Sequence, residues 1–139
     1  MLCVTFLGSS KLIFANRYNI CTLDTKVNQS SPNLVVTGLE DVAALDFMHD
    51  EQMVYWTDIT QEKIRAARLN GSLNTADILS SGLVSPDGLA CDWVTRKLYW
   101  VDSETNRIEV CGLNGTIRKV LVWQELDQPR ALALDPRNG

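Results

Sequence analysis

Few side chains in this sequence have the types and spacing that catalysis requires. The single histidine, His49, lies in the polar stretch His49-Asp50-Glu51-Gln52 with no second imidazole to share a metal ion or a proton. No unique acid and no Ser/His pair stands out. The sequence therefore predicts no catalytic residue, no metal site and no cofactor, and we expect a protein that is not an enzyme.

Four cysteines, Cys3, Cys21, Cys91 and Cys111, permit three pairings as two disulfides. None of them has Cys-x-x-Cys spacing, and Cys91 and Cys111 lie in apolar runs, where a thiol behaves as a small buried hydrophobe. Free structural thiols are the favoured interpretation, and disulfides remain the alternative.

Composition and charge narrow the class of protein. The chain has 139 residues, 45% apolar and 22% charged, with 13 Lys and Arg against 17 Asp and Glu and a net charge of −4. This balance argues against a nucleic-acid partner, because no basic excess is available to neutralise phosphates. No apolar run is long enough to cross a bilayer, so we expect any membrane anchor to lie outside this chain. Residues 1–11 lack the basic head of a secretory signal and are expected to be a leader or a poorly ordered segment.

A repeat organises most of the chain. Tyr55-Trp56-Thr57-Asp58 recurs as Tyr99-Trp100-Val101-Asp102, a shift of 99 − 55 = 44 residues. Ala44-Leu45-Asp46-Phe47, Ala90-Cys91-Asp92-Trp93 and Ala133-Leu134-Asp135-Pro136 form a looser series. A fixed period of this length indicates stacked structural units.

Short runs with period-two alternation, separated by polar or Gly/Pro turns, predict β-strands and no helix. In the second unit we expect strands at Val42–Phe47, Met53–Asp58, Lys63–Leu69 and Thr75–Leu79. In the third unit they are expected at Gly88–Asp92, Lys97–Asp102, Arg107–Leu113 and Ile117–Val122. A first unit without its opening strand is expected at Leu12–Asn16, Ile20–Asp24 and Leu34–Thr37, and Ala131–Asp135 is expected to open a fourth.

Four strands in a period of about 40 to 45 residues are typical of a β-propeller blade. We therefore expect an all-β fold: a partial propeller over residues 12–139, with about two full four-stranded blades plus parts of two others, from blade 1 to the start of blade 4. The repeated side chains should pack between sheets and accept hydrogen bonds there, rather than act in catalysis: Tyr55, Trp56, Asp58, Tyr99, Trp100 and Asp102. Their repetition also argues against the enzyme alternative, in which carboxylates or metals above a propeller channel catalyse hydrolysis.

At these residues the sequence resembles the six-bladed propellers of the low-density-lipoprotein receptor family. The resemblance is closest to the first propeller of its Wnt co-receptor branch, the receptor-related protein 5/6 type, and runs from about Leu12 to Gly139. It is carried by Gly38-Leu39-Glu40-Asp41, Leu83 to Trp93, Asp102 to Val110 and Trp123 to Ala131.

The resemblance implies extracellular binding by a single-pass plasma-membrane receptor whose transmembrane segment is absent from this chain. The implied partners are Wnt ligands, secreted antagonists with Asn-x-Ile segments and, through the parent protein, a Frizzled-type receptor. The positions that match the family's ligand-binding face are Arg17, Glu40, Asp41, Ile59, Thr60, Ser85, Asp87, Ser103, Glu104 and Arg130.

The chemistry of this set fits ligand binding, because its carboxylates can accept hydrogen bonds from amide donors and basic side chains. Ordinary solvated loop charges are the competing interpretation. A structural or adhesion propeller of a matrix protein, without a Wnt role, is the alternative function. The chain departs from the family at Tyr18-Asn19-Ile20-Cys21, where the family is more charged, and at Ile59-Thr60.

The sequence also predicts a glycan and an incomplete ring. Of the sequons at Asn28, Asn70 and Asn114, Asn70 aligns with a sequon of the co-receptor propeller and is the predicted glycosylation site, although Asn-Gly is also a preferred hairpin turn. The family's ring has six blades, so this chain by itself is expected to expose sheet faces and to be prone to aggregation.

Overall fold

The computed structural model describes residues 3–6, 10–29, 31–69 and 74–139, with side chains from residue 10 onward. The secondary structure of these residues is all β, in three four-stranded antiparallel sheets. The first sheet contains β1 (Cys3–Phe6), β2 (Lys11–Ala15), β3 (Ile20–Asp24) and β4 (Asn33–Val36). The second contains β5 (Val42–Met48), β6 (Met53–Asp58), β7 (Lys63–Arg68) and β8 (Thr75–Leu79). The third contains β9 (Pro86–Asp92), β10 (Lys97–Asp102), β11 (Arg107–Gly112) and β12 (Lys119–Val122).

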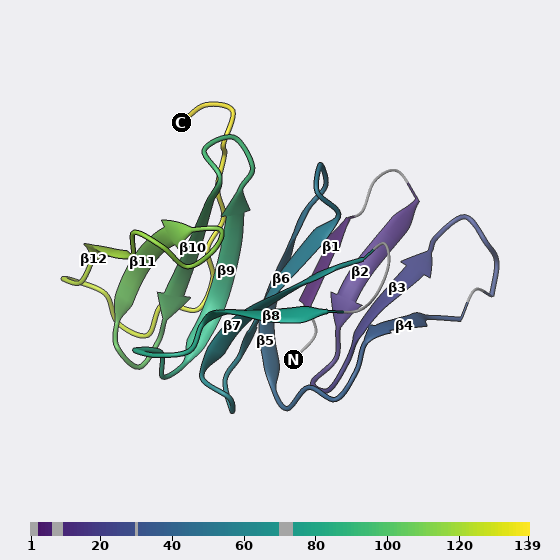
Figure 1. The fold of residues 1–139 in the computed structure, drawn as a ribbon, viewed down its shortest axis with the longest axis horizontal. Coiled ribbons are helices and arrows are strands. Elements are labelled where there is room, and N and C mark those ends of the chain that lie inside the picture. Colours follow the sequence, from purple (N-terminus) through teal and green to yellow (C-terminus); the bar gives the residue numbers. More distant parts are fainter. Residues whose placement is uncertain (1–2, 7–9, 30, 70–73) are drawn as a thin grey trace.

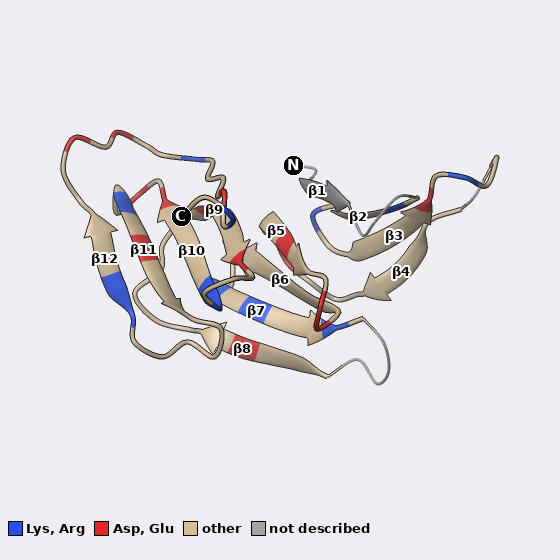
Figure 2. Cartoon of the chain, turned by 90° about the horizontal axis from the view of Figure 1, so that it is seen from above, with Lys and Arg blue, Asp and Glu red and all other residues tan. Residues whose placement is uncertain are grey.

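Each sheet is a meander in which sequential strands pair as neighbours. The sheets stand side by side in chain order, with β1–β4 at one end of the molecule and β9–β12 at the other (Figure 1). Seen from above, they follow one another along an arc (Figure 2). The first strands of neighbouring sheets pack together, β1 beside β5 and β5 beside β9. This is the arrangement of successive propeller blades, so the all-β prediction is confirmed.

Two expectations at the ends of the arc are wrong. The first sheet has an opening strand, because Cys3–Phe6 pairs antiparallel with β2, in register from Cys3 opposite Ala15 to Phe6 opposite Leu12. Residues 1–11, expected as a leader or poorly ordered segment, therefore contain β1 and the start of β2. The described residues thus contain three four-stranded blades rather than about two.

Ala131–Asp135, expected to open a fourth blade, is not a strand. A Cβ added to Gly88 of β9 would lie 3.1 Å from the Arg130 carbonyl oxygen and 3.2 Å from the Ala131 Cα. Because Cβ atoms project from the face of a sheet, this segment contacts the face of β9, as β5 does on its own side of the arc. No described strand pairs with it, so it forms no ladder of backbone hydrogen bonds.

The core lies between the sheets, and alternation along each strand divides the side chains between its two sides. Trp56 packs with Ile13 and Val36 in the cluster between the first and second sheets. Its neighbour Tyr55 points the other way, into the cluster with Trp100 between the second and third sheets. Trp56 and Trp100 are completely buried. The Tyr55-Trp56 pair therefore links the second sheet to both of its neighbours.

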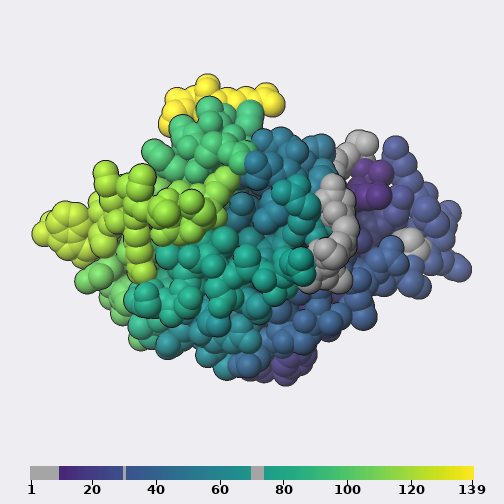
Figure 3. Space-filling view, viewed as in Figure 1, coloured from purple at the N-terminus to yellow at the C-terminus, as the bar shows by residue number. Residues whose placement is uncertain are grey.

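The outer face of the third sheet is less covered than the matching faces of the other two. Ile20, Ile64 and Ile108 occupy equivalent positions and pair with Val36, Leu79 and Val122 respectively. Val36 and Leu79 are 4% and 9% exposed, but Val122 is 37% exposed. In the space-filling view, β12 and the segment after it form one end of the molecule (Figure 3). In the first two sheets, the next sheet along the chain covers Val36 of β4 and Leu79 of β8.

Candidate functional site

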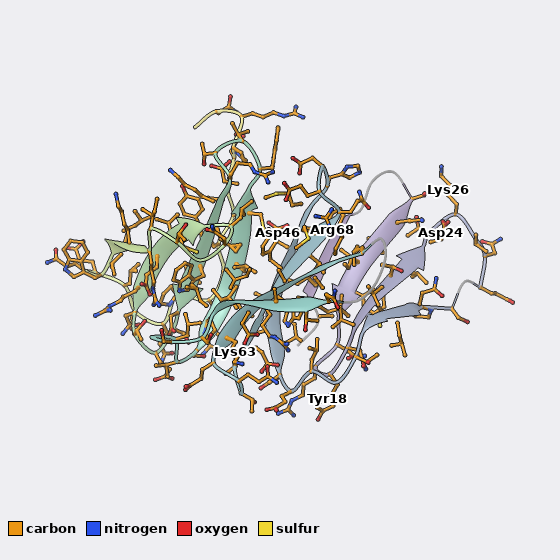
Figure 4. All side chains as sticks on the ribbon, in the orientation of Figure 1. Tyr18, Asp24, Lys26, Asp46, Lys63 and Arg68 are labelled. Carbon is orange, nitrogen blue, oxygen red and sulfur yellow. The ribbon has the colours of Figure 1, made fainter. Side chains whose placement is uncertain are left out.

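The predicted ligand-binding residues gather along one edge of the arc. We call this edge the rim: the β2–β3, β6–β7 and β10–β11 turns (16–19, 59–62 and 103–106), the linkers before β5 and β9 (37–41 and 80–85), Asp87 at the start of β9, and residues 128–130. Because strands alternate in direction, the turns after β2, β6 and β10 lie at the same end as the starts of β5 and β9. Tyr18, in the β2–β3 turn, and Lys63, the first residue of β7 directly after the β6–β7 turn, lie on one side of the molecule in Figure 4.

Asp58 holds the rim between the first and second sheets. Its side chain is completely buried at the end of β6. Its carboxylate accepts hydrogen bonds from the backbone N–H groups of Glu40 at 3.0 Å, Asp41 at 3.3 Å and Gln61 at 3.0 Å. A backbone bond from the Ile59 N–H to the Asp41 carbonyl, at 3.0 Å, joins the same two segments. One buried carboxylate thus shapes both the linker and the turn.

Asp102 repeats this arrangement between the second and third sheets. It is also completely buried. Its Oδ2 accepts the Val84 N–H at 2.9 Å, and its Oδ1 accepts those of Ser85, Glu104 and Thr105 at 3.1, 3.1 and 3.0 Å. Carboxylates bonded to several backbone donors hold loops firmly, because these hydrogen bonds are charge-assisted. The rim is therefore preorganised at two places that are equivalent in the repeat.

The rim side chains differ in how much they face solvent. Arg17, Glu40, Thr60, Glu104 and Arg130 are exposed. Those that are only partly exposed are Asp41, Ile59, Ser85 and Asp87. Ser103 is 6% exposed, and its backbone N–H donates to the Ser85 carbonyl at 3.0 Å. Ser103 thus lies on the rim but is nearly closed to a ligand, whereas the others present atoms to solvent. Their role in ligand binding stays a prediction.

Contacts among these side chains orient several of them. The Arg17 Nε lies 3.2 Å from the Asp41 Oδ1. The Gln61 side-chain amide donates to the Glu40 carboxylate at 3.4 Å. The Ser85 hydroxyl donates to the Asp87 carboxylate, 3.2 Å from its nearer oxygen. Gln61 was not among the predicted residues, although its position directly after Asp58-Ile59-Thr60 is a signal that could have found it.

Outside the rim, a cavity lies between β5, β9 and the C-terminal segment. This cavity of about 400 Å³ is lined by Leu45, Asp46, Phe47, Leu89, Ala90, Cys91, Trp93, Leu132, Ala133, Leu134 and Pro136. Asp46 uses its carboxylate here to join two sheets, because its Oδ2 accepts the Cys91 N–H of β9 at 2.8 Å. Burial raises the pKa of Asp46. The equivalent Asp92 instead accepts the Val94 and Thr95 N–H groups within its own turn.

The remaining candidates for chemistry are buried thiols or lie outside the described residues. Cys21, Cys91 and Cys111 are buried free thiols, and burial raises the pKa of Cys111 to about 11. In the described ranges, no group of three His, Cys, Asp or Glu side chains could hold a metal ion. The same ranges contain no helix that is long and apolar enough to cross a bilayer. Asn70, the predicted glycosylation site, lies outside the described residues.

Comparison with known proteins agrees with the repeat and the fold. The chain is 57% identical over 133 residues to low-density lipoprotein receptor-related protein 5 of Mus musculus and 56% identical to that of Homo sapiens. Each alignment covers 95% of this chain but only 8% of the relative. The expected resemblance to the receptor-related protein 5/6 type is thereby confirmed.

Solved structures share the fold at much lower identity. A chain of the nidogen/laminin complex superposes with a TM-score of 0.88 at 22% identity, covering 99% of this chain and 53% of that one. An auxiliary nutrient binding protein from Bacteroides thetaiotaomicron gives a TM-score of 0.76 at 10% identity, covering 96% and 33%. The family model for the low-density lipoprotein receptor repeat class B matches residues 52–93 and 96–136. Since the matches cover more than half of the sequence, the chain belongs to the family of proteins with low-density lipoprotein receptor class B repeats.

Proposed function

We propose that this chain is part of the extracellular ligand-binding propeller of a Wnt co-receptor and that its rim binds secreted proteins. The observation that carries the proposal is the pair of buried carboxylates, Asp58 and Asp102, that hold the rim loops by their backbone N–H groups. Loops fixed in this way present their outward side chains with little entropy left to lose on binding. The 57% identity to a receptor-related protein supports the same function.

The proposed partners are Wnt ligands and secreted antagonists that carry Asn-x-Ile segments. A Frizzled-type receptor would be engaged through the parent protein, at the extracellular side of the plasma membrane. In this proposal residues 12–139 provide one part of the propeller. The chain spans 8% of the receptor-related proteins it matches, so the remaining parts of such a receptor lie outside it.

The chemistry of the rim suits an amide-bearing peptide. Glu40, Asp41 and Glu104 offer carboxylate oxygens to an Asn side-chain amide or to backbone N–H groups, and charge-assisted bonds of this kind are short and directional. The partly exposed Ile59 offers an apolar contact to the Ile side chain. Arg130 adds a donor for ligand carbonyls. Acceptors, an apolar contact and a donor thus match the groups of an Asn-x-Ile segment.

The test measures binding of a synthetic Asn-Ala-Ile peptide to the complete propeller that contains this chain, by isothermal titration calorimetry. Glu104→Lys should weaken binding about 10- to 100-fold, because it removes a charged acceptor and introduces a positive charge. Asp50→Lys is the matched control, since it makes the same charge change in the β5–β6 turn at the opposite edge of the arc. We expect this control to retain wild-type affinity.

An affinity that Glu104→Lys leaves unchanged would contradict the proposal. That outcome would favour the alternative of a structural or adhesion propeller without a Wnt role. The similarity to the nidogen chain, at 22% identity, supports only a shared fold and does not favour that alternative.

A further inference from the structure

Tyr18 is an exposed aromatic residue on the rim that the proposed site does not use. Its side chain is 55% exposed in the β2–β3 turn. Of the other two tyrosines, Tyr55 is only 3% exposed and Tyr99 is partly exposed. An exposed tyrosine at a binding edge is noteworthy because tyrosine is enriched among the residues that dominate binding energy.

The backbone of Tyr18 is held on both sides. The Asn16 Oδ1 accepts the N–H groups of Tyr18 at 3.0 Å and Asn19 at 2.8 Å, which closes the turn. The Tyr18 carbonyl accepts the Leu39 N–H at 3.0 Å, and this bond ties the turn to the linker between the first two sheets. The turn cannot move without breaking these bonds. Its exposed ring therefore projects from a fixed point.

The side chain is also held in place, by a cation–π contact. The Arg17 guanidinium lies 5.7 Å from the centre of the Tyr18 ring, within the range of this interaction. The Asp41 carboxylate orients the same guanidinium through an ion pair at 3.2 Å. Asp41 is itself fixed by the buried Asp58, which accepts its N–H at 3.3 Å. A continuous chain of contacts thus connects the Tyr18 ring to the buried frame of the rim.

From this arrangement we infer that Tyr18 is a specificity-determining residue of the rim, which selects ligands with an aromatic or apolar side chain next to their Asn-x-Ile core. The inference rests on the proposed function and deepens it. A tyrosine ring supplies a large, rigid contact surface at low entropic cost. Arg17 holds the ring but leaves more than half of the side chain in solvent. The free part of the ring is available to stack on a planar or apolar ligand group.

The test uses two synthetic nine-residue peptides that share an Asn-Ala-Ile core. One carries Phe at both positions that flank the core, and the other carries Ala there. Calorimetry with the complete propeller that contains this chain measures both affinities for wild type, Tyr18→Ala, Tyr18→Phe and Tyr18→Arg. Val27→Ala is the control, because Val27 is 57% exposed in the β3–β4 loop at the opposite edge of the arc.

We expect wild type to prefer the Phe-flanked peptide about 2- to 12-fold, the range that an aromatic pair contributes. Tyr18→Ala and Tyr18→Arg should abolish this preference and leave the affinity for the Ala-flanked peptide within about twofold of wild type. Tyr18→Phe and Val27→Ala should retain the preference. Since Tyr18→Phe removes only the hydroxyl group, it shows whether the ring or the hydroxyl group carries the preference. The retained affinity of Tyr18→Ala and Tyr18→Arg for the Ala-flanked peptide separates loss of the aromatic contact from loss of folding.

The outcomes distinguish this inference from the function on which it rests. If both peptides bind equally to wild type, or if the preference survives in Tyr18→Ala, the inference is wrong and the proposed function stands. If Val27→Ala loses the preference to the same extent, the effect is not specific to the rim and the inference is also wrong. If neither peptide binds to wild type, both the proposed function and the inference fail.

Discussion

Replacing Asp102 tests whether one buried carboxylate holds the rim. In Asp102→Asn, the remaining carbonyl oxygen can keep the bonds of Oδ1 to the Ser85, Glu104 and Thr105 N–H groups. The new NH2 group replaces Oδ2 and faces the Val84 N–H, which loses its acceptor. One unsatisfied buried N–H costs about 1–3 kcal/mol. Asp102→Ala loses all the bonds of both oxygens, so at about 1 kcal/mol each we expect a loss of about 4 kcal/mol.

Urea unfolding followed by tryptophan fluorescence measures these losses. Trp100 lies in the same strand as Asp102 and is completely buried, so its fluorescence changes when the sheet unfolds. The exposed Asp127 provides the control: Asp127→Asn should change the free energy of unfolding by less than about 0.5 kcal/mol. Equal losses for Asp102→Asn and Asp102→Ala would refute the division of bonds between the two oxygens. Losses below about 0.5 kcal/mol for both would refute the idea that this carboxylate organises the rim.

Three further predictions concern contacts between and within the sheets. Because burial raises the pKa of Asp46, its contribution to the free energy of unfolding is greatest below pH about 4 and falls as pH rises through the folded-state pKa. Unfolding of wild type and Asp46→Asn across this pH range measures that contribution: wild type should lose stability relative to Asp46→Asn as pH rises, and a relative gain with rising pH would contradict the prediction. Gly115→Ala should lower the free energy of unfolding by about 1–3 kcal/mol, since φ at Gly115 is +84° and a Cβ would collide with the Ile78 carbonyl oxygen. Thermal unfolding measures this loss, and an unchanged melting temperature would count against it. Arg118→Met should lower the free energy of unfolding by about 3 kcal/mol, because Glu109, whose side chain is 4% exposed, loses its partner at 2.9 Å. Adding Glu109→Gln to Arg118→Met should restore part of this loss. No restoration would exclude the unpaired charge as the cause.

The strands of the second and third sheets could be predicted closely from local pattern. The expected strands Met53–Asp58 and Lys97–Asp102 coincide with β6 and β10. Period-two alternation and Gly/Pro turns are local signals, so they mark strands before any tertiary contact forms. The opening strand at Cys3–Phe6 was missed because its apolar run was interpreted as part of a leader, although Gly8-Ser9-Ser10 follows it in the sequence as a turn signal.

The rim was predictable as a set of loops but not as a set of accessible side chains. The positions of Glu40 and Glu104 in loops follow from the strand pattern, and both are exposed. The burial of Ser103 does not follow from that pattern, because it depends on how the β10–β11 turn packs under the linker that contains Ser85. Exposure of a loop residue is set by neighbours that are distant in the sequence.

By itself, the sequence determined the repeat, most of the β-strands and the family, because each of these rests on local composition or on a period that recurs along the chain. Tertiary structure alone decided which donors meet which carboxylates. Asp46 accepts the Cys91 N–H of another sheet, whereas Asp92, at the same position in the repeat, accepts N–H groups of its own turn. The difference arises because a hydrogen bond needs a partner within about 3 Å, and only the stacking of a particular sheet brings one there.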